Sequence, residues 1–354
     1  MIPANLSKKV LSVGPEFLPP KGGIAQVIFN YHKYFFLADE FRYIANSCEG
    51  HYINKTFKLI ASLMQYVIAL TFQRQIRIVH IHTASYFSFK RSSWFVGLAK
   101  LFRKKIILHI HGGGFKEYYA NEIRFVRHTL AKCDTIVVLT EAWAKWFRTE
   151  VGVDNLVVVP NVIPEPAKCE NIEKDDKFLV LFLGLINDQK GIFDLINAIK
   201  LNQEKLNGRF ELHVGGNGQV ERLKNEITEN NLEGIVKYEG WVDSVAKHNL
   251  LCRCDALILP SYIEGLPLSI LEAMAYRKAV ITTPVGGIPS MIEDGTNGFL
   301  VEPGDGSAFV DKIIYLIEHR QECLLMGEYS FHLVKKHFPN SVAVDLVQLY
   351  EKLI

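Results

Sequence analysis

The chain has 354 residues, of which 49% are hydrophobic and 22% are charged, and its formal net charge is +2. This composition is typical of an ordinary soluble globular protein and gives no indication of a nucleic-acid partner. The length exceeds what one hydrophobic core comfortably fills, so two domains are expected.

The near-neutral total hides an asymmetry between the two halves. Residues 1–170 carry 22 Lys and Arg against 12 Asp and Glu, whereas the remainder carries 18 against 26. A basic first half predicts an anionic partner or surface for that half.

The cysteines and the apolar segments of the chain indicate which cellular compartment to expect. The six cysteines are scattered, with Cys252 and Cys254 the only close pair, so neither a zinc site nor a disulfide framework is predicted and a reducing cytoplasm is favoured. The polar start, residues 1–9, lacks the pattern of a signal peptide. The most apolar segment, residues 59–72, falls short of the ~18–20 residues of a membrane span and predicts a core or interfacial helix.

The first half alternates strands and helices. A strand over residues 9–14 leads through a loop ending in Gly22 and Gly23 to a helix over 24–36, and such a turn either approaches phosphate or is a plain tight turn. Strands over 76–82 and 106–111 follow. His111 ends the second of these, where ligands sit in open parallel sheets. His109 is a weaker candidate, and His80 and His82 are expected only to line a cleft.

A basic aromatic segment covers residues 90–105. Trp94, Phe95, Leu98 and Phe102 recur there at helical spacing among six Lys and Arg residues. This mix fits an interfacial helix on an anionic membrane, and equally a helix that packs its apolar stripe on the first sheet.

The second half repeats the alternation. Residues 165–177 are rich in Glu, Lys and Asp and predict a linker, after which the strand 178–183 opens a new series. Gly215 and Gly240 fall at the ends of later strands, over 210–214 and 236–241. Helices over 306–336 and 341–354 close the chain. The alternation predicts an α/β fold with two doubly wound parallel sheets.

The stretch 260–275 is the most informative. Gly265 permits a sharp turn, and Pro267 suits a first helical position. The N-terminus of the helix that follows can bind a phosphate group. Glu264 and Glu272 flank that helix start with backbones about 10 Å apart. A ligand with hydroxyls at both ends and phosphates between them, such as a nucleotide sugar, fits this spacing.

The run Glu264-Gly-Leu-Pro-Leu-Ser-Ile-Leu-Glu272-Ala-Met-Ala resembles the Glu-x7-Glu signature of retaining glycosyltransferases of the group 1, family 4 type. The resemblance implies a GT-B fold, in which two Rossmann-like domains face each other across a cleft. Residues 1–164 would bind the acceptor and residues 178–340 the donor, with 165–177 as the linker and helix 341–354 packing back on the first domain.

The resemblance also implies roles for residues. Glu264 and His111 would contact the transferred sugar, Lys190 the diphosphate and Glu272 the ribose, so that Glu264, Lys190 and His111 are the catalytic candidates. The implied donor-binding residues are Gly22, Gly23, Lys190, Gly215, Gly240, Trp241, Gly265, Leu266, Pro267, Leu268, Ser269 and Glu272. One departure stands out, because Leu185 occupies the position of a usual arginine and leaves Lys190 to neutralise the diphosphate with helix dipoles or a cation from elsewhere.

The implied activity is transfer of a sugar from a nucleotide-diphosphate sugar to a saccharide or lipid-linked acceptor, with retention, in bacterial cell-surface polysaccharide or glycolipid synthesis. No Asp-x-Asp run stands at a strand end, so no metal or other cofactor is expected. The expected location is the cytoplasm, with peripheral contact to the inner membrane face. A sugar-nucleotide epimerase of the same architecture and a non-catalytic nucleotide-sugar-binding protein are the alternatives.

Overall fold

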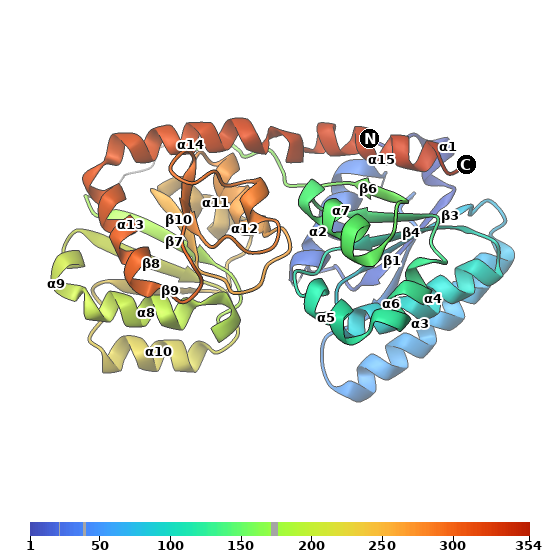
Figure 1. Cartoon of the computed structure of the whole chain (residues 1–354), viewed down its shortest axis with the longest axis horizontal. Helices are drawn as coiled ribbons and strands as arrows, with labels where there is room; N and C mark the ends of the chain where they lie inside the picture. The colour runs from blue at the N-terminus through green and yellow to red at the C-terminus, as the bar shows by residue number, and fades with distance from the viewer. Residues whose placement is uncertain (21, 38–39, 171–175) are drawn as a thin grey trace. The chain divides into compact units, whose positions relative to one another are not determined.

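The computed structural model describes residues 1–20, 22–37, 40–170 and 176–354. The chain forms two compact units, Met1–Pro164 with Lys336–Ile354, and Glu165–Lys335 (Figure 1). Each unit contains a six-stranded parallel sheet with helices on its two faces, which confirms the α/β class with two doubly wound sheets. The C-terminal helix α15 (Pro339–Glu351) belongs to the first unit and contacts α2. Part of the expected linker, residues 171–175, lies outside the described residues.

The first sheet has the strand order β2-β1-β3-β4-β5-β6. Its strands are β1 (Val10–Pro15), β2 (Tyr43–Ser47), β3 (Ile78–Thr83), β4 (Lys105–Ile110), β5 (Thr135–Val138) and β6 (Leu156–Val158). Its helices besides α15 are α1 (Ala4–Ser7), α2 (Gly23–Phe35), α3 (Tyr52–Phe72), α4 (Phe87–Leu101), α5 (Phe115–Asn121), α6 (Ile123–Leu130) and α7 (Glu141–Trp146), which continues as a π-helical turn, Phe147–Val151.

Alternation along the strands gives the first sheet two different faces. One face is apolar: Leu11, Val79 and Leu108 pack there with side chains of α3, α4 and α6. The other face carries polar side chains between β1 and β4, among them His80, and it packs against Tyr31 of α2 and Tyr350 of α15. The polar side chains of this sheet, His80 among them, therefore lie under α2 and α15.

The second sheet has the order β12-β11-β10-β7-β8-β9. Its strands are β7 (Phe178–Leu183), β8 (Phe210–Gly215), β9 (Val236–Gly240), β10 (Ala256–Leu259), β11 (Ala279–Thr282) and β12 (Gly298–Leu300). Its helices are α8 (Ile192–Leu201), α9 (Gln203–Leu206), α10 (Val220–Glu229), α11 (Ser244–Arg253), α12 (Leu268–Ala275), α13 (Gly306–Glu318) and α14 (Arg320–Val334), with short 3-10 turns at Asp188–Lys190, Ile288–Ser290 and Lys335–His337.

The second sheet is covered by α8 and α10 on one face and by α11 and α12 on the other (Figure 1). Strand β7, with the sequence Phe-Leu-Val-Leu-Phe-Leu, is buried along its whole length, as expected for a central parallel strand enclosed on both sides. The helix expected over 306–336 is two helices, because the chain leaves helical geometry at His319 (φ −119°, ψ 54°).

The expectation that the cysteines form no disulfide was wrong. Cys169 and Cys252 form a disulfide, with Cα atoms 5.6 Å apart, that joins the start of the second unit to α11. The two residues are 83 positions apart, so their spacing in the sequence gave no sign of the pair. The scattered positions of the cysteines therefore no longer favour a reducing compartment. Within the described part of the chain, no helix combines the length and the apolar character needed to cross a bilayer.

Candidate functional site

Glu264, the first carboxylate of the Glu-x7-Glu run, lies in the loop after β10 and is buried. Nζ of Lys190 donates to Oε1 of Glu264, and Oγ of Ser261 donates to the same oxygen at 2.8 Å. Lys190 comes from the 3-10 turn after β7, so the structure brings together two predicted catalytic residues that are 74 positions apart. A buried carboxylate requires such partners, and the pair sets one cation and one anion at the carboxyl edge of the sheet.

Glycine residues let the neighbouring loops pack closely around Glu264. Gly191 has φ +68°, and a Cβ there would lie 2.0 Å from the carbonyl oxygen of Pro260. Gly286 has φ +60°, and a Cβ there would lie 1.8 Å from the carbonyl oxygen of Glu264. Any other residue would force the backbones apart. The loop that carries Glu264 is thus held between the loops that follow β7 and β11.

The predicted donor-binding residues from Gly265 to Ser269 carry the chain from this loop into α12. Pro267 is the N-cap, with an extended ψ of 126°, and not the first helical residue as expected. Leu268 and Ser269 form the first turn. The start of a helix directs backbone N–H groups outward and carries about half a positive charge, which favours an anion.

Glu272 lies in the second turn of α12 and is also buried. Its Oε1 accepts a hydrogen bond from Nζ of Lys247, which lies on α11. Both carboxylates of the Glu-x7-Glu run are therefore paired with a lysine. The sequence reasoning missed Lys247, because nothing in its local pattern separates it from a solvated lysine on a helix.

Gly215, Gly240 and Trp241 lie at the ends of the neighbouring strands β8 and β9. Gly215 pairs with Gly240 in the sheet register, and the amide of Gly216 donates to the carbonyl of Gly240 at 2.9 Å. The side chain of Trp241 is more than half exposed. These residues share the carboxyl edge of the sheet with Lys190.

Leu185 brings no charge to this edge, and its side chain is 46% exposed. Arg222 of α10 nevertheless brings a cation to this loop, because its Nη1 donates to Oδ1 of Asp188 at 2.8 Å. The guanidinium of Arg222 also stacks over the ring of Phe193, 3.7 Å from its centroid. Besides Lys190, Arg222 of α10 is thus paired with this loop, and Lys247 of α11 is paired with Glu272 of α12.

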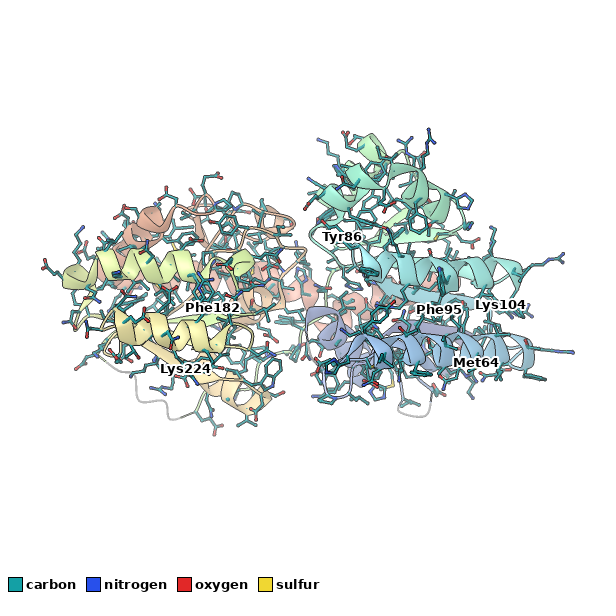
Figure 2. The ribbon with its side chains drawn as sticks, turned by 90° about the horizontal axis from the view of Figure 1, so that it is seen from below. Met64, Tyr86, Phe95, Lys104, Phe182 and Lys224 are labelled. Atoms are coloured by element: carbon teal, nitrogen blue, oxygen red, sulfur yellow. A yellow bond between two sulfur atoms is a disulfide. The ribbon has the colours of Figure 1, made fainter. Side chains whose placement is uncertain are left out.

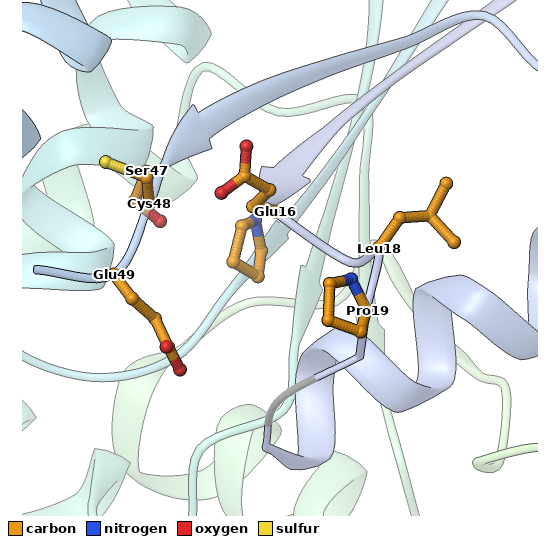
Figure 3. Close-up of a pocket in the computed structure, with 7 residues that line it drawn as sticks. Glu16, Leu18, Pro19, Ser47, Cys48 and Glu49 are labelled. Atoms are coloured by element: carbon orange, nitrogen blue, oxygen red, sulfur yellow. The ribbon is translucent and has the colours of Figure 1, made fainter.

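In the first unit, Gly22 caps α2 with φ +91°, whereas Gly23 begins the helix with open space around it. Only Gly22 therefore has a conformation that requires glycine. Lys21, beside them, lies outside the described residues. The same loop borders a pocket of about 310 Å³ at the carboxyl ends of β1 and β2 (Figure 3). Its lining residues are Pro15, Glu16, Leu18, Pro19, Ser47, Cys48 and Glu49.

His111 follows β4 directly and is 9% exposed. Burial lowers the pKa of His111 to about 3, so the imidazole is neutral at pH 7. Its Nε2 lies 3.0 Å from Nδ1 of His82. His80, His82 and His109, expected at the edge or in a cleft, are instead enclosed within the first unit, because α2 and α15 cover this face of the sheet.

Family models match both halves of the chain. A model for group 1 glycosyl transferases matches residues 165–332, and one for glycosyltransferase family 4 matches residues 25–165. The chain belongs to the group 1, family 4 glycosyltransferases. Membership of the predicted family is therefore confirmed, and retention of the anomeric configuration stays a prediction.

Two individual relatives share 32% and 26% identity with this chain over the matched residues. An uncharacterised glycosyltransferase of Methanocaldococcus jannaschii, MJ1178, is 32% identical over 174 residues, so the match spans 49% of this chain and about half (48%) of MJ1178. An N,N'-diacetylbacillosaminyl-diphospho-undecaprenol alpha-1,3-N-acetylgalactosaminyltransferase of Campylobacter jejuni is 26% identical over 261 residues, covering 68% of this chain and 67% of that protein.

Among solved structures, Anabaena Alr3699/HepE in complex with UDP superposes with a TM-score of 0.76 at 18% sequence identity. The superposition covers 98% of this chain and 99% of that one. At this identity the likeness concerns the fold, and it confirms the GT-B class.

Proposed function

We propose that this chain transfers a sugar from a nucleoside-diphosphate sugar to an acceptor hydroxyl with retention of the anomeric configuration. The two ion pairs at α12, Lys190 with Glu264 and Lys247 with Glu272, carry this proposal. A ligand that brings hydroxyls to the carboxylates and phosphates to the lysines replaces each ion pair with interactions of similar strength. Such a ligand does not leave a buried carboxylate unpaired.

In the proposed reaction the bond between the anomeric carbon and the diphosphate oxygen breaks. The acceptor hydroxyl attacks the same face of the sugar, and its proton passes to the departing phosphate oxygen. Lys190 and the amides at the start of α12 stabilise the charge that develops on the diphosphate, and this electrostatic contribution is the main one required of the protein. Glu264 orients the sugar, and the role of His111 in this step stays a prediction.

We propose that this step uses no metal ion at the diphosphate. Lys190 and the helix start supply positive charge there, and Arg222 or Lys247 compensates for the missing arginine at Leu185. As the first donor to test we choose a UDP-sugar, because Alr3699/HepE binds UDP.

For the acceptor we propose the pocket at the ends of β1 and β2. Glu16 and Glu49 bring two carboxylates to its wall (Figure 3), and carboxylate oxygens are strong acceptors for sugar hydroxyls. The Campylobacter relative is named for a diphospho-undecaprenol-linked acceptor, and we propose a lipid-linked saccharide here as well.

A lipid-linked acceptor requires contact with a membrane surface, and the structure changes which helix we propose for it. Phe95 of α4 is fully buried. Just beyond this helix, Lys104 donates to the carbonyl of Ile76, and Lys105 of β4 pairs with Asp134. This helix therefore packs on the sheet, which was the alternative interpretation of residues 90–105.

Helix α3, which lies beside α4 (Figures 1 and 2), exposes a continuous apolar face. The exposed residues recur at helical spacing: Ile53, Phe57, Ile60, Met64, Ile68 and Phe72, each at least 50% exposed. The helix contains Lys55 and Lys58 and no acidic residue. An apolar face with flanking cations on a basic half of the chain fits the headgroup region of an anionic membrane.

Two measurements separate this proposal from its rivals. Thermal shifts with UDP-, GDP- and ADP-sugars identify the donor, since a bound ligand raises the apparent stability. Sugar release from the labelled donor is then followed with and without acceptor lipids. Acceptor-dependent transfer supports the proposal, epimerised donor without transfer supports an epimerase, and binding without either product supports a non-catalytic protein.

A further inference from the structure

Four histidines lie together on one face of the first sheet. His80 and His82 alternate on β3, His109 and His111 follow the same alternation on β4 and just beyond it, and His82 stands opposite His109 in the register. Strands β3 and β4 therefore turn all four rings to the side covered by α2 and α15. His80 and His109 are fully buried, and His82 is 2% exposed.

The contacts of these rings form two short chains. His80 Nδ1 lies 2.7 Å from Tyr350 Oη, and His80 Nε2 lies 3.2 Å from His109 Nδ1. His82 Nδ1 lies 3.0 Å from His111 Nε2. Each neutral imidazole offers one donor and one acceptor, so each chain needs a partner at its end.

The first chain ends without such a partner. His109 Nε2 is buried and has no hydrogen-bond partner among the described residues, and the same holds for Oη of Tyr31, whose ring lies 6.3 Å from that of His109. Leaving a buried polar atom unpaired costs about 1–3 kcal/mol. A cation bound to one ring nitrogen of His109 would give this ring a strong partner in place of its 3.2 Å contact with His80.

We infer that His80, His82 and His109 bind one divalent transition-metal ion of the class that prefers imidazole, with Zn²⁺ as the best fit. One ring nitrogen of each residue lies within 4.8 Å of those of the other two. Zinc–nitrogen bonds of about 2.0–2.1 Å require nitrogens about 3.3–3.4 Å apart in a tetrahedron, so the rings close by at most about 1.5 Å. Three neutral imidazoles are a sufficient protein ligand set for zinc, with a fourth position for water or a tyrosine oxygen.

Partners that would orient two of the three ligands are already in place. A metal-binding histidine normally donates its second ring N–H to a neighbouring acceptor, which fixes the ring. Tyr350 Oη occupies that position for Nδ1 of His80, and His111 Nε2 occupies it for Nδ1 of His82. With these nitrogens as donors, Nε2 of both histidines is left for the ion.

The proposed ion would join β3 to β4 and, through Tyr350, to α15. It would stabilise the first unit, whereas the groups proposed for the donor diphosphate belong to the second unit. The ion thus acts on the stability of the first unit, and it is linked to the predicted catalytic residues only through His111, which accepts from His82.

The test uses the full chain without an affinity tag, stripped by a chelator and then titrated with Zn²⁺ or Co²⁺. We expect one equivalent to bind, a rise in melting temperature, and the intense visible absorption of tetrahedral Co²⁺. X-ray absorption of the zinc form should give only nitrogen or oxygen neighbours near 2.0–2.1 Å; a sulfur shell near 2.3 Å would assign the ion to cysteines and overturn the site.

Variants then locate the ion. His82→Gln and His109→Gln should lower the affinity at least tenfold, whereas His128→Gln, which changes an exposed histidine on α6, should leave it unchanged. Equal affinity in all three variants, or less than 0.1 equivalent of ion bound by the wild-type chain at about 1 mM Zn²⁺, overturns the inference. If the two cluster variants fail to fold, the cobalt and X-ray absorption spectra of the wild type decide.

Discussion

Lys247 on α11 donates to Glu272 on α12, although the two residues are 25 positions apart and only Glu272 is marked by a sequence motif. Glu272 is buried, and the side chain of Lys247 is about a quarter exposed. In the proposed donor complex, ribose hydroxyls would bind the carboxylate of Glu272, and Lys247 would be free to contact a phosphate. Lys247 is therefore our candidate for part of the charge that Leu185 does not supply.

Lys247→Ala should weaken binding of UDP about tenfold, which corresponds to about 1.4 kcal/mol, and should affect uridine much less because uridine carries no phosphate. Calorimetric titration with both ligands measures the difference. Lys224→Ala is the matched control, because Lys224 pairs with Glu221 on the exposed side of α10. Equal losses for UDP and uridine would show that Lys247 only positions Glu272.

The two carboxylates of the Glu-x7-Glu run should differ in role. Glu272→Gln should weaken the free nucleoside diphosphate as well as the donor, whereas Glu264→Gln should mainly lower kcat, since only Glu272 is assigned to the ribose. Titration of UDP and steady-state kinetics with the donor separate these effects. An unchanged UDP affinity in Glu272→Gln contradicts the assignment.

Lys190 should carry a large share of leaving-group stabilisation. Lys190→Ala should cost about 3 kcal/mol in the transition state, or about a hundredfold in kcat/KM. The loss of its partner also leaves Glu264 buried without its lysine, so the melting temperature is measured alongside and should fall. Lys190→Arg, which keeps the charge, should recover part of the rate. A loss of less than threefold in Lys190→Ala would refute the role.

Membrane contact should depend on α3 and not on α4. In sedimentation with vesicles, binding should increase with the fraction of anionic lipid and decrease with salt. Changing Phe57, Met64 and Ile68 together to Ser should weaken vesicle binding at least tenfold, because these side chains expose 70%, 58% and 57% of their surface.

The control for that experiment changes Leu201, Leu324 and Leu325, which are exposed in the second unit, to Ser. It should bind vesicles like the wild type. Equal binding by both triple variants would contradict α3 as the contact, whereas no binding at any lipid composition would favour a soluble acceptor.

The sequence was sufficient for the fold class and for the motif in the second unit. The spacing of apolar residues along the strands and helices, together with glycines at strand ends, predicts two parallel sheets. This prediction is possible because the pattern of each element lies within its own short stretch of sequence. The stretch from Glu264 to Glu272 predicts its own loop and helix for the same reason.

Pairings between distant positions were not accessible from the sequence. Lys190 meets Glu264, Lys247 meets Glu272 and Cys169 meets Cys252 only because the order of strands in the second sheet brings their loops and helices together. The burial of the histidines depends likewise on α15, which returns from the far end of the chain. Helix α3 shows a further limit, since an apolar period does not say whether the apolar face meets a core or solvent.

Retaining transfer of the sugar to a lipid-linked acceptor can be measured directly. The wild-type chain is incubated with a labelled UDP-sugar and extracted bacterial lipid-linked saccharides, and the product is examined by NMR. Label should enter the lipid fraction only when both chain and acceptor are present, and the new linkage should have the anomeric configuration of the donor. Inverted configuration, or binding of the donor with no label transferred to any acceptor from UDP-, GDP- or ADP-sugars, would contradict it.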